Sequence, residues 1–544
     1  MTRMTGGQAV VKSLLRHGVD TLFALPGVQM DYLFNALHDD SNAIRVIHTR
    51  HEQGAAYMAF GYAQSSGRVG VYAVVPGPGL LNTTAALATA YGCNVPVLCL
   101  AGQIPSAYIG KGMGFLHEIP DQLGVIRGLT KWAERIDHPT RAPALVDEAF
   151  ARLGEGRPRP VGLEVAMDVL AQTSEVSFPE PRPAAPAPEP DGELVREAAQ
   201  ILGAAEKPVI FVGSGVYGAE AELLEVAEML QAPVVSYRGG RGAVSDRHYL
   251  GLTQPAGYRL WAEADAVLAV GTRLQHQRMS WGVDDELKIV HIDIDPTEIR
   301  RVRRPAVGLV ADAGQALAAL RPELERTNRR RASRERELTD LKAAVTAEIS
   351  DKLGPQMAYL RVLREVLPDD GILVNELTQV GYAALIAFPV YAPRTLLSSG
   401  YQGTLGYGYA TALGAKLANP DKKVLSINGD GGFLYNVQEL ATAVKHGIGV
   451  VAVVFNDGAF GNVRRMQMEL YGGKVIASEL SNPDFVRLAE SFGIPGHRAE
   501  SPEALGTALG QALDEPGPSL IEVPVGVMPD PWPLIMPRRV RPAR

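Results

Sequence analysis

The sequence predicts an α/β protein with three Rossmann-like domains, each built on a parallel sheet. Short apolar runs alternate with segments whose apolar residues recur every three or four positions, which is typical of strands joined by crossover helices. Two breaks divide the 544 residues into three such blocks. One is a proline-rich stretch from Phe178 to Pro190, expected to be an extended linker, and the other is a charged, exposed helix expected from Glu323 to about Asp351.

The first block displays this alternation most clearly. Thr5 fits the cap of an amphipathic helix that runs to His17 and stops at Gly18. Strands are then expected at residues 21–25, 44–48, 69–75 and 95–101, with helices at 30–38, at 52–64 and up to about residue 91. The third block repeats the rhythm, with strands around Val374 and at 395–397, 424–427 and 450–455. This common order of elements predicts similar parallel sheets in the two blocks.

The central block carries a glycine pattern that has two interpretations. Its first strand, 209–212, is followed by Gly213-Ser214-Gly215-Val216-Tyr217-Gly218, the Gly-x-Gly-x-x-Gly spacing of dinucleotide-binding turns. The next strand, however, ends in Tyr237 and Arg238 rather than in an acidic residue that could bind a ribose. We therefore favour a tight structural turn over a nucleotide site.

Composition is that of an ordinary globular protein with a large core. Hydrophobic residues make up 46% and charged residues 21%, and the net charge of −7 argues against a general nucleic-acid surface. No run of about 18 apolar residues is present, so no membrane span is expected. Residues 1–7 lack a charged segment followed by an apolar block, so no signal peptide is expected and the default location is the cytoplasm.

The most specific chemistry follows two strands of the third block. Asp430 lies in the run Asn428-Gly429-Asp430-Gly431-Gly432 after the strand 423–427, and Asn456 ends the strand 450–455. Because a helical segment connects these strands, parallel pairing would put Asp430 and Asn456 side by side at one sheet edge. A carboxylate, an amide oxygen and a backbone carbonyl suit a hard divalent cation, and the glycines let backbone N–H groups approach a phosphate ester. The pattern predicts a metal–diphosphate site.

Gly-Asp-Gly, then 24 residues (432–455), then Asn is also the spacing found in thiamin-diphosphate enzymes. The chain resembles the acetolactate synthase-like family of these enzymes, although its motif ends in Asn456-Asp457 where relatives usually have Asn-Asn. The resemblance implies thiamin diphosphate and Mg²⁺ as cofactors, with Asp430, Asn456 and the backbone oxygen of Gly458 as metal ligands. It also implies a pyrimidine-binding domain (1–172), a Pro-rich linker (173–192), a central domain (193–322), a charged helical linker (323–355) and a diphosphate-binding domain (356–544).

Glu52 resembles the glutamate that activates the cofactor in this family. It opens a helix at the end of a strand, and a carboxylate at the far nitrogen of the aminopyrimidine favours the tautomer that takes the thiazolium proton. The alternative is a glutamate that only favours a helix start. In the segment 399–408, Leu405 matches the apolar wedge that bends the cofactor, and the carbonyl of Gly403 would accept from its amino group.

Further site residues follow from the same resemblance. Gln103 and His117 lie on the expected substrate side and are the candidate catalytic residues besides Glu52. His117 stands near a glutamine of the family, and it is either a proton donor or a structural histidine. The other expected cofactor contacts are Pro26, Asn82, Thr378, Gln379, Gly429, Gly431, Gly432, Ala459 and Phe460.

The resemblance implies cleavage or ligation of 2-oxo acids through an enamine intermediate. The substrates would be a small 2-oxo acid and, for ligation, a carbonyl acceptor. Acetolactate synthase is the nearest named activity. The alternatives are a benzoylformate-type decarboxylase or carboligase, a flavin-linked 2-oxo acid oxidase, and a catalytically silent binding homologue.

Two expectations concern the central domain and the assembly. Flavin-carrying relatives hold FAD in the central domain, and Arg273 resembles one of their contacts. The segment after Gly251 is short and lacks their glycine-rich approach, which speaks against FAD. A homodimer or homotetramer is expected, because in this family Glu52 of one subunit reaches cofactor that another subunit holds.

Overall fold

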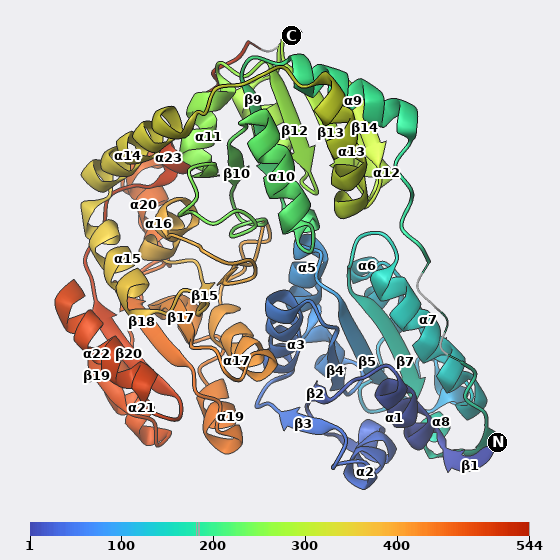
Figure 1. Cartoon of the computed structure of the whole chain (residues 1–544). Helices are drawn as coiled ribbons and strands as arrows, with labels where there is room; N and C mark the ends of the chain where they lie inside the picture. The colour runs from blue at the N-terminus through green and yellow to red at the C-terminus, as the bar shows by residue number, and fades with distance from the viewer. Residues whose placement is uncertain (181, 183–184, 543–544) are drawn as a thin grey trace.

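Three α/β domains follow one another along the chain in the computed structural model (Figure 1). The structure describes residues 1–180, 182 and 185–542. Each domain is built on a six-stranded parallel sheet with helices against its faces. In Figure 1 the N-terminal domain runs from blue to teal, the central domain from green to yellow-green, and the C-terminal domain from yellow through orange to red. The predicted fold class is therefore confirmed.

The N-terminal sheet has the strand order β3-β2-β4-β5-β7-β6. Its strands are β2 (Thr21–Ala24), β3 (Arg45–His48), β4 (Gly70–Val74), β5 (Val97–Gln103), β6 (Ala133–Ile136) and β7 (Val161–Ala166), and its helices are α1 (Gly6–Arg16), α2 (Asp31–Asp39), α3 (Glu52–Ser66), α4 (Pro78–Leu81), α5 (Thr84–Cys93), α6 (Gln122–Leu129), α7 (Ala142–Gly154) and α8 (Met167–Ala171). Thr5 caps α1, because its hydroxyl accepts from Gln8 N while the Gln8 side chain accepts from Thr5 N.

The central sheet has the strand order β11-β10-β9-β12-β13-β14. Its strands are β9 (Pro208–Val212), β10 (Val234–Ser236), β11 (Gly251–Thr253), β12 (Ala266–Val270), β13 (Lys288–Asp293) and β14 (Val307–Val310), and its helices are α9 (Gly192–Ala204), α10 (Glu220–Leu230), α11 (Gln254–Trp261), α12 (Pro296–Arg300) and α13 (Ala313–Thr327). Before it, β8 (Thr173–Val176) pairs antiparallel with β1 (Thr2–Thr5). The expected proline-rich linker includes residues 181, 183 and 184, which lie outside the described residues.

The C-terminal sheet has the strand order β16-β15-β17-β18-β20-β19. Its strands are β15 (Ile372–Asn375), β16 (Leu396–Leu397), β17 (Val424–Gly429), β18 (Val451–Asn456), β19 (Gly496–Arg498) and β20 (Ser519–Pro524), and its helices are α15 (Gly354–Val366), α16 (Gln379–Ala387), α17 (Gly408–Ala418), α18 (Asp430–Phe433), α19 (Glu439–His446), α20 (Gly461–Leu470), α21 (Phe485–Ser491), α22 (Pro502–Asp514) and α23 (Trp532–Ile535). Its parallel strands end at one edge, where the candidate site lies.

The charged segment between the central and C-terminal domains contains α14 (Glu335–Lys352). This helix was expected to be exposed, but it buries Leu338, Val345 and Ile349 on one side. Its other positions are mostly charged or small residues, so the helix is amphipathic rather than free in solvent. No helix within residues 1–180, 182 and 185–542 is long and apolar enough to cross a membrane.

Helices α3 and α17 pack against each other and join the N-terminal domain to the C-terminal domain (Figure 1). Tyr57 of α3 and Tyr407, just before α17, lie in one buried cluster with ring centroids 6.2 Å apart. Phe60 and Leu413 belong to the same cluster. Because this cluster is a shared apolar core, the two domains pack as one unit within a single chain.

Candidate cofactor-binding site

Asp430 and Asn456 lie side by side at the carboxyl ends of β17 and β18. The two strands pair in parallel with Gly429 opposite Phe455, so the next residues of each strand are neighbours. The amide nitrogen of Asn482 donates to Asp430 Oδ2 at 2.6 Å and to Asn456 Oδ1 at 2.9 Å. Burial raises the pKa of Asp430, which is 1% exposed, and the Asn482 amide opposes that shift. Two oxygens of these side chains therefore converge on one point.

Glu522 decides which way the Asn456 amide faces. The Asn456 Nδ2 donates to Glu522 Oε1 at 2.8 Å, which leaves the Oδ1 atom on the Asp430 side. Arg498 in turn donates to Glu522 Oε2 at 2.9 Å. Sequence reasoning missed both Asn482 and Glu522. Asn482 precedes a helix without any motif, and Glu522 lies in an apolar strand, so no spacing rule identifies either residue.

Gly458 contributes its backbone to the same place. Its N–H donates to Asn456 Oδ1 at 3.3 Å, and its carbonyl accepts from Leu480 N at 2.8 Å. The carbonyl oxygen has a second lone pair, so one acceptor position stays open. Ala459 is buried and bridges to Glu479, which ties the segment 458–460 to the segment 478–480.

Gly431 and Gly432 are glycines for a packing reason. A Cβ on Gly431 would lie 2.6 Å from the Phe460 ring, and a Cβ on Gly432 would overlap Glu376 Oε1. Gly429 differs, because a Cβ there would make only ordinary contacts, the nearest at 3.4 Å from Leu377 O. The sequence argument assigned these glycines to phosphate approach alone. The structure adds that two of them let Phe460 and Glu376 pack directly on the start of α18.

Glu376 is a buried carboxylate that sequence reasoning did not single out. It is 1% exposed and accepts from Gly406 N at 2.7 Å and Gly408 N at 3.2 Å. Burial raises the pKa of Glu376 to about 7, against the effect of these two N–H donors. The loop that carries Gly403 and Leu405 is anchored by these bonds.

Leu405 is only half-buried, which leaves one of its faces open to a ligand.

Thr378 and Gln379 lie beside the Gly429 turn. Thr378 is buried at the start of α16, and its Cβ lies 3.7 Å from the position of a Cβ on Gly429. Gln379 donates to Asp457 Oδ2 at 2.7 Å and to Gly526 O at 3.2 Å, and it accepts from Met528 N at 2.7 Å. Burial, with Asp430 nearby, raises the pKa of Asp457 to about 6. Gln379 would have to exchange one of these bonds before it could donate to a phosphate.

Pro26, Glu52 and Asn82 gather at the carboxyl edge of the N-terminal sheet. They follow β2, β3 and β4, which are neighbours in the strand order. Glu52 is the first residue of α3, is half-buried, and accepts from Asn82 Nδ2 at 2.9 Å through Oε2. Within the part of the chain that the structure describes, no hydrogen bond joins Glu52 to the Asp430 and Asn456 pair. One chain carries two groups of candidate residues, one at the edge of the N-terminal sheet and one at the edge of the C-terminal sheet.

The two candidate substrate-side residues have different surroundings. Gln103 is 3% exposed, donates to Glu164 Oε2 at 3.3 Å, and accepts from Ile104 N at 2.8 Å. His117 has a φ of 70°, an uncommon conformation for a residue with a side chain. Its Nδ1 is buried and lacks a partner among the described residues. The polar atoms of Gln103 are thus hydrogen-bonded within the domain, whereas His117 keeps one polar atom without a partner. The catalytic roles of Gln103 and His117 stay predictions.

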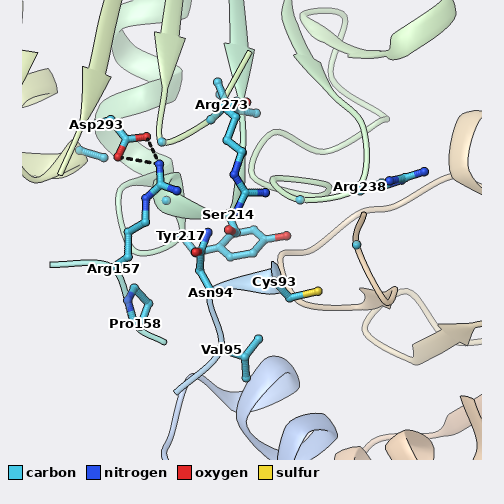
Figure 2. Close-up of a pocket in the computed structure, with 18 of the residues that line it drawn as sticks. Cys93, Asn94, Val95, Arg157, Pro158, Ser214, Tyr217, Arg238, Arg273 and Asp293 are labelled. Carbon is cyan, nitrogen blue, oxygen red and sulfur yellow. Dashed lines mark hydrogen bonds and ion pairs between the residues drawn. The ribbon is translucent and has the colours of Figure 1, made fainter. Parts of the chain in front are cut away.

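A cavity of about 620 Å³ lies where residues of all three domains meet (Figure 2). It includes the Gly213–Gly215 turn, where a Cβ on Gly215 would lie 2.7 Å from Gly271 Cα, so the glycine spacing has a structural reason. Arg157 lines one side of the cavity and donates to both carboxylate oxygens of Asp293 at 3.1 and 3.2 Å (Figure 2). The acid at the end of β13 is therefore already paired.

Comparison with known proteins identifies the class to which this fold and site belong. Three family descriptions match the chain in order: the thiamine pyrophosphate enzyme N-terminal TPP binding domain (residues 4–125), central domain (195–320) and C-terminal TPP binding domain (378–523). The chain belongs to the family of thiamine pyrophosphate enzymes. The resemblance drawn from the sequence is confirmed.

Individual relatives are similar over nearly the whole chain. A protein described as a probable 2-ketoarginine decarboxylase of Pseudomonas aeruginosa is 35% identical, with 96% of this chain and 94% of the relative covered. A probable acetolactate synthase large subunit of Methanocaldococcus jannaschii is 35% identical (96% and 92% covered). The acetolactate synthase isozyme 1 large subunit of Escherichia coli is 31% identical (98% and 96% covered). The chain is thus a thiamine pyrophosphate-dependent enzyme of the acetolactate synthase-like and 2-oxo acid decarboxylase family, of transferase or lyase type.

Proposed function

We propose that the protein cleaves 2-oxo acids, and ligates the product to a carbonyl acceptor, with thiamin diphosphate and Mg²⁺. The observation that carries this proposal is the pair of oxygens from Asp430 and Asn456, which converge at adjacent strand ends. An acetolactate synthase-like reaction is the first candidate, because relatives with that name cover nearly the whole chain.

The residues present fit a magnesium–diphosphate group. Asp430 and Asn456 offer two oxygens, and the Gly458 carbonyl offers a third beside them. Among residues 1–180, 182 and 185–542 no group of three or more His, Cys, Asp or Glu side chains is placed to hold a metal ion. That suits Mg²⁺, which keeps few protein carboxylates and takes other oxygens from phosphates and water. Thr378 would supply a hydroxyl donor to the diphosphate.

Thiamin diphosphate, when bound, supplies a stabilised carbanion that adds to the substrate carbonyl. The protein's side chains hold and orient the cofactor and the substrate. Glu52 would hold and exchange the proton of the aminopyrimidine ring nitrogen. Asn82 fixes the Glu52 carboxylate by donating to it at 2.9 Å. Leu405 would press against the cofactor from its half-buried position, and His117 would serve as proton donor on the substrate side.

We propose that the working site forms between two copies of the chain. Glu52 and Asp430 belong to separate groups within one chain, so a second copy is needed to bring such groups together. Helix α20, which follows Phe460, has no buried residue. Around it the apolar side chains Val463, Met466, Met468, Leu470, Tyr471 and Ile476 are all at least 40% exposed. Such a patch is typical of an interface, and a second copy is the occupant we propose.

The active enzyme is therefore expected to sediment as a dimer or tetramer at the concentration used for assays. Sedimentation velocity with activity measured across the boundary would test this. Leu470→Glu should shift the protein toward monomer and reduce activity, since it puts a charge into the proposed contact. Glu490→Gln, at an exposed position of α21, changes the surface charge outside the proposed contact and serves as the control. An active monomer would contradict the shared site.

The reaction is decided by product analysis after incubation with single 2-oxo acids. Pyruvate, aryl 2-oxo acids and 2-ketoarginine form the panel, the last because one relative is described as a 2-ketoarginine decarboxylase. Acetolactate from pyruvate supports the proposed reaction. An aldehyde and carbon dioxide, without a ligated product, would support the decarboxylase alternative. A protein that turns over none of these while binding cofactor would support a silent homologue.

The purified protein is expected to lack flavin absorbance. Asp293 ends β13 at the wall of the cavity in which a flavin nucleotide would have to lie, and both its oxygens accept from Arg157. Breaking this buried pair to admit FAD would cost several kcal/mol, on the order of 3–5. A visible spectrum before and after acid denaturation tests the expectation, since acid releases bound flavin. A flavin spectrum would instead favour the flavin-linked oxidase.

A further inference from the structure

Glu439 of the C-terminal domain reaches the strand–helix turn that carries Glu52. It is the first residue of α19 and is fully buried. Its Oε1 accepts from His51 N at 3.1 Å and from Arg50 N at 3.2 Å, and its Oε2 accepts from Arg50 N at 3.2 Å. Thr442 completes the set by donating to Oε2 at 2.6 Å. A carboxylate of one domain thus binds two successive N–H groups of another.

The carboxylate is packed tightly as well as hydrogen-bonded. A Cβ on Gly54, in the first turn of α3, would lie 2.5 Å from Glu439 Oε1, so only glycine leaves room for it. Burial raises the pKa of Glu439, and the donors from Thr442, Arg50 and His51 oppose this shift. A buried carboxylate is costly unless donors offset its desolvation, and these three donors offset part of that cost at a single geometry.

We propose that Glu439 is a positioning residue for Glu52. Arg50 and His51 immediately precede Glu52, and their N–H groups would otherwise be buried at a helix start without this acceptor. Holding both groups fixes where α3 begins and therefore where the Glu52 carboxylate points. This inference rests on the proposed function, in which Glu52 activates the cofactor.

The mechanism predicts an effect on chemistry larger than the effect on cofactor binding. Displacing a catalytic group by about 1 Å costs up to roughly 100-fold in rate. Asp430, Asn456 and Gly458 lie at other strand ends and, in the part of the chain that the structure describes, make no hydrogen bond to Glu439. Magnesium and diphosphate binding should therefore be preserved. Without the Glu439 carboxylate, the backbone before Glu52 would shift, and only the hydrogen bond from Asn82 would still hold the Glu52 side chain.

Glu439→Ala is the first test, read by exchange of the cofactor's thiazolium proton for deuterium. The loaded enzyme should exchange at least about tenfold more slowly than wild type, with cofactor affinity unchanged in calorimetry. Glu439→Gln should recover most of the exchange rate, because its amide oxygen can replace Oε1 for both N–H groups and Thr442 can turn to accept. Lys445→Ala, at an exposed position of the same helix, is the matched control and should exchange like wild type.

Gly54→Ala provides a second route that keeps the carboxylate. The added methyl group would displace Glu439 from the turn, so exchange should slow although every polar group remains. Circular dichroism and thermal unfolding monitor the fold of each variant. If both Glu439→Ala and Gly54→Ala fail to fold, Glu439 has a structural role and the proposal is overturned.

A double-mutant cycle with Glu52→Gln separates this proposal from the function on which it rests. If Glu439 acts through Glu52, Glu439→Ala adds little further loss of exchange once Glu52 is glutamine. Equal, independent losses in both backgrounds would overturn the positioning role while leaving the role of Glu52 intact. Exchange at the wild-type rate in Glu52→Gln itself would instead overturn the proposed function of Glu52.

Discussion

Glu52→Gln is expected to slow exchange of the thiazolium proton by about 100-fold or more while cofactor stays bound, in line with the loss of a positioned acid–base group. Glutamine matches the shape of glutamate and can still contact Asn82, but its amide cannot favour the required ring tautomer as a carboxylate does. Cofactor affinity should change little, because the oxygens proposed for magnesium belong to the C-terminal domain. Quenched-flow deuterium exchange followed by NMR measures the rate directly.

Glu155→Gln, which changes an exposed carboxylate in the same domain, provides the control. It should exchange at the wild-type rate. If Glu52→Gln does so as well, Glu52 merely starts a helix, and the assignment of Pro26, Asn82 and Glu52 to the pyrimidine end would have to be abandoned.

Asp430→Ala is expected to abolish magnesium-dependent cofactor binding, with affinity at least about 100-fold weaker, since losing even an outer partner of a metal ligand costs 10–100-fold. The fold should survive. Burial raises the pKa of Asp430, so its charge is unfavourable without a cation and its removal costs the apoprotein little. Isothermal titration of thiamin diphosphate with and without Mg²⁺ would record the loss.

Asp421→Ala, in the exposed turn before β17, is the matched control and should bind cofactor normally. Thermal unfolding of both apoproteins shows whether the fold is retained. Undiminished magnesium-dependent binding in Asp430→Ala would mean that the oxygens at these strand ends do not hold the metal, and the proposed site would fail.

Parallel topology explains why so much of the candidate site could be foreseen. A side chain that follows a parallel strand must lie at the carboxyl edge of the sheet, so two strand ends joined by a helix predict neighbours. Asp430 and Asn456 meet for this reason. Glu52 and Asn82 share the carboxyl edge of the N-terminal sheet, although β2 lies between the strands that they follow. The same periodicity located four strands of each outer sheet to within a few residues, because buried parallel strands are continuous apolar runs. It did not locate β6, β7, β19 or β20.

The residues that orient these side chains could not be foreseen. Asn482 contacts Asn456 from the segment before α21, and Glu522 contacts it from β20. Neither residue belongs to a recognisable motif. Glu376 was passed over as part of a polar turn, although its two backbone donors come from about thirty residues further along. Such contacts depend on the relative placement of whole elements, which local spacing does not encode. The packing side of α14 escaped prediction for the same reason.

The uncovered helix α20 has a chemical consequence. Met466 and Met468 are 40% and 56% exposed in a single chain, so peroxide can reach their sulfur atoms. Oxidation would turn two flexible apolar side chains into polar sulfoxides on the surface proposed to meet a second copy. A chain that is kept alone would thus lose, with time, the ability to associate, whereas an associated chain would shield the same sulfurs. The degree of oxidation of Met466 and Met468 would then show whether a sample had been stored as single chains or as associated ones.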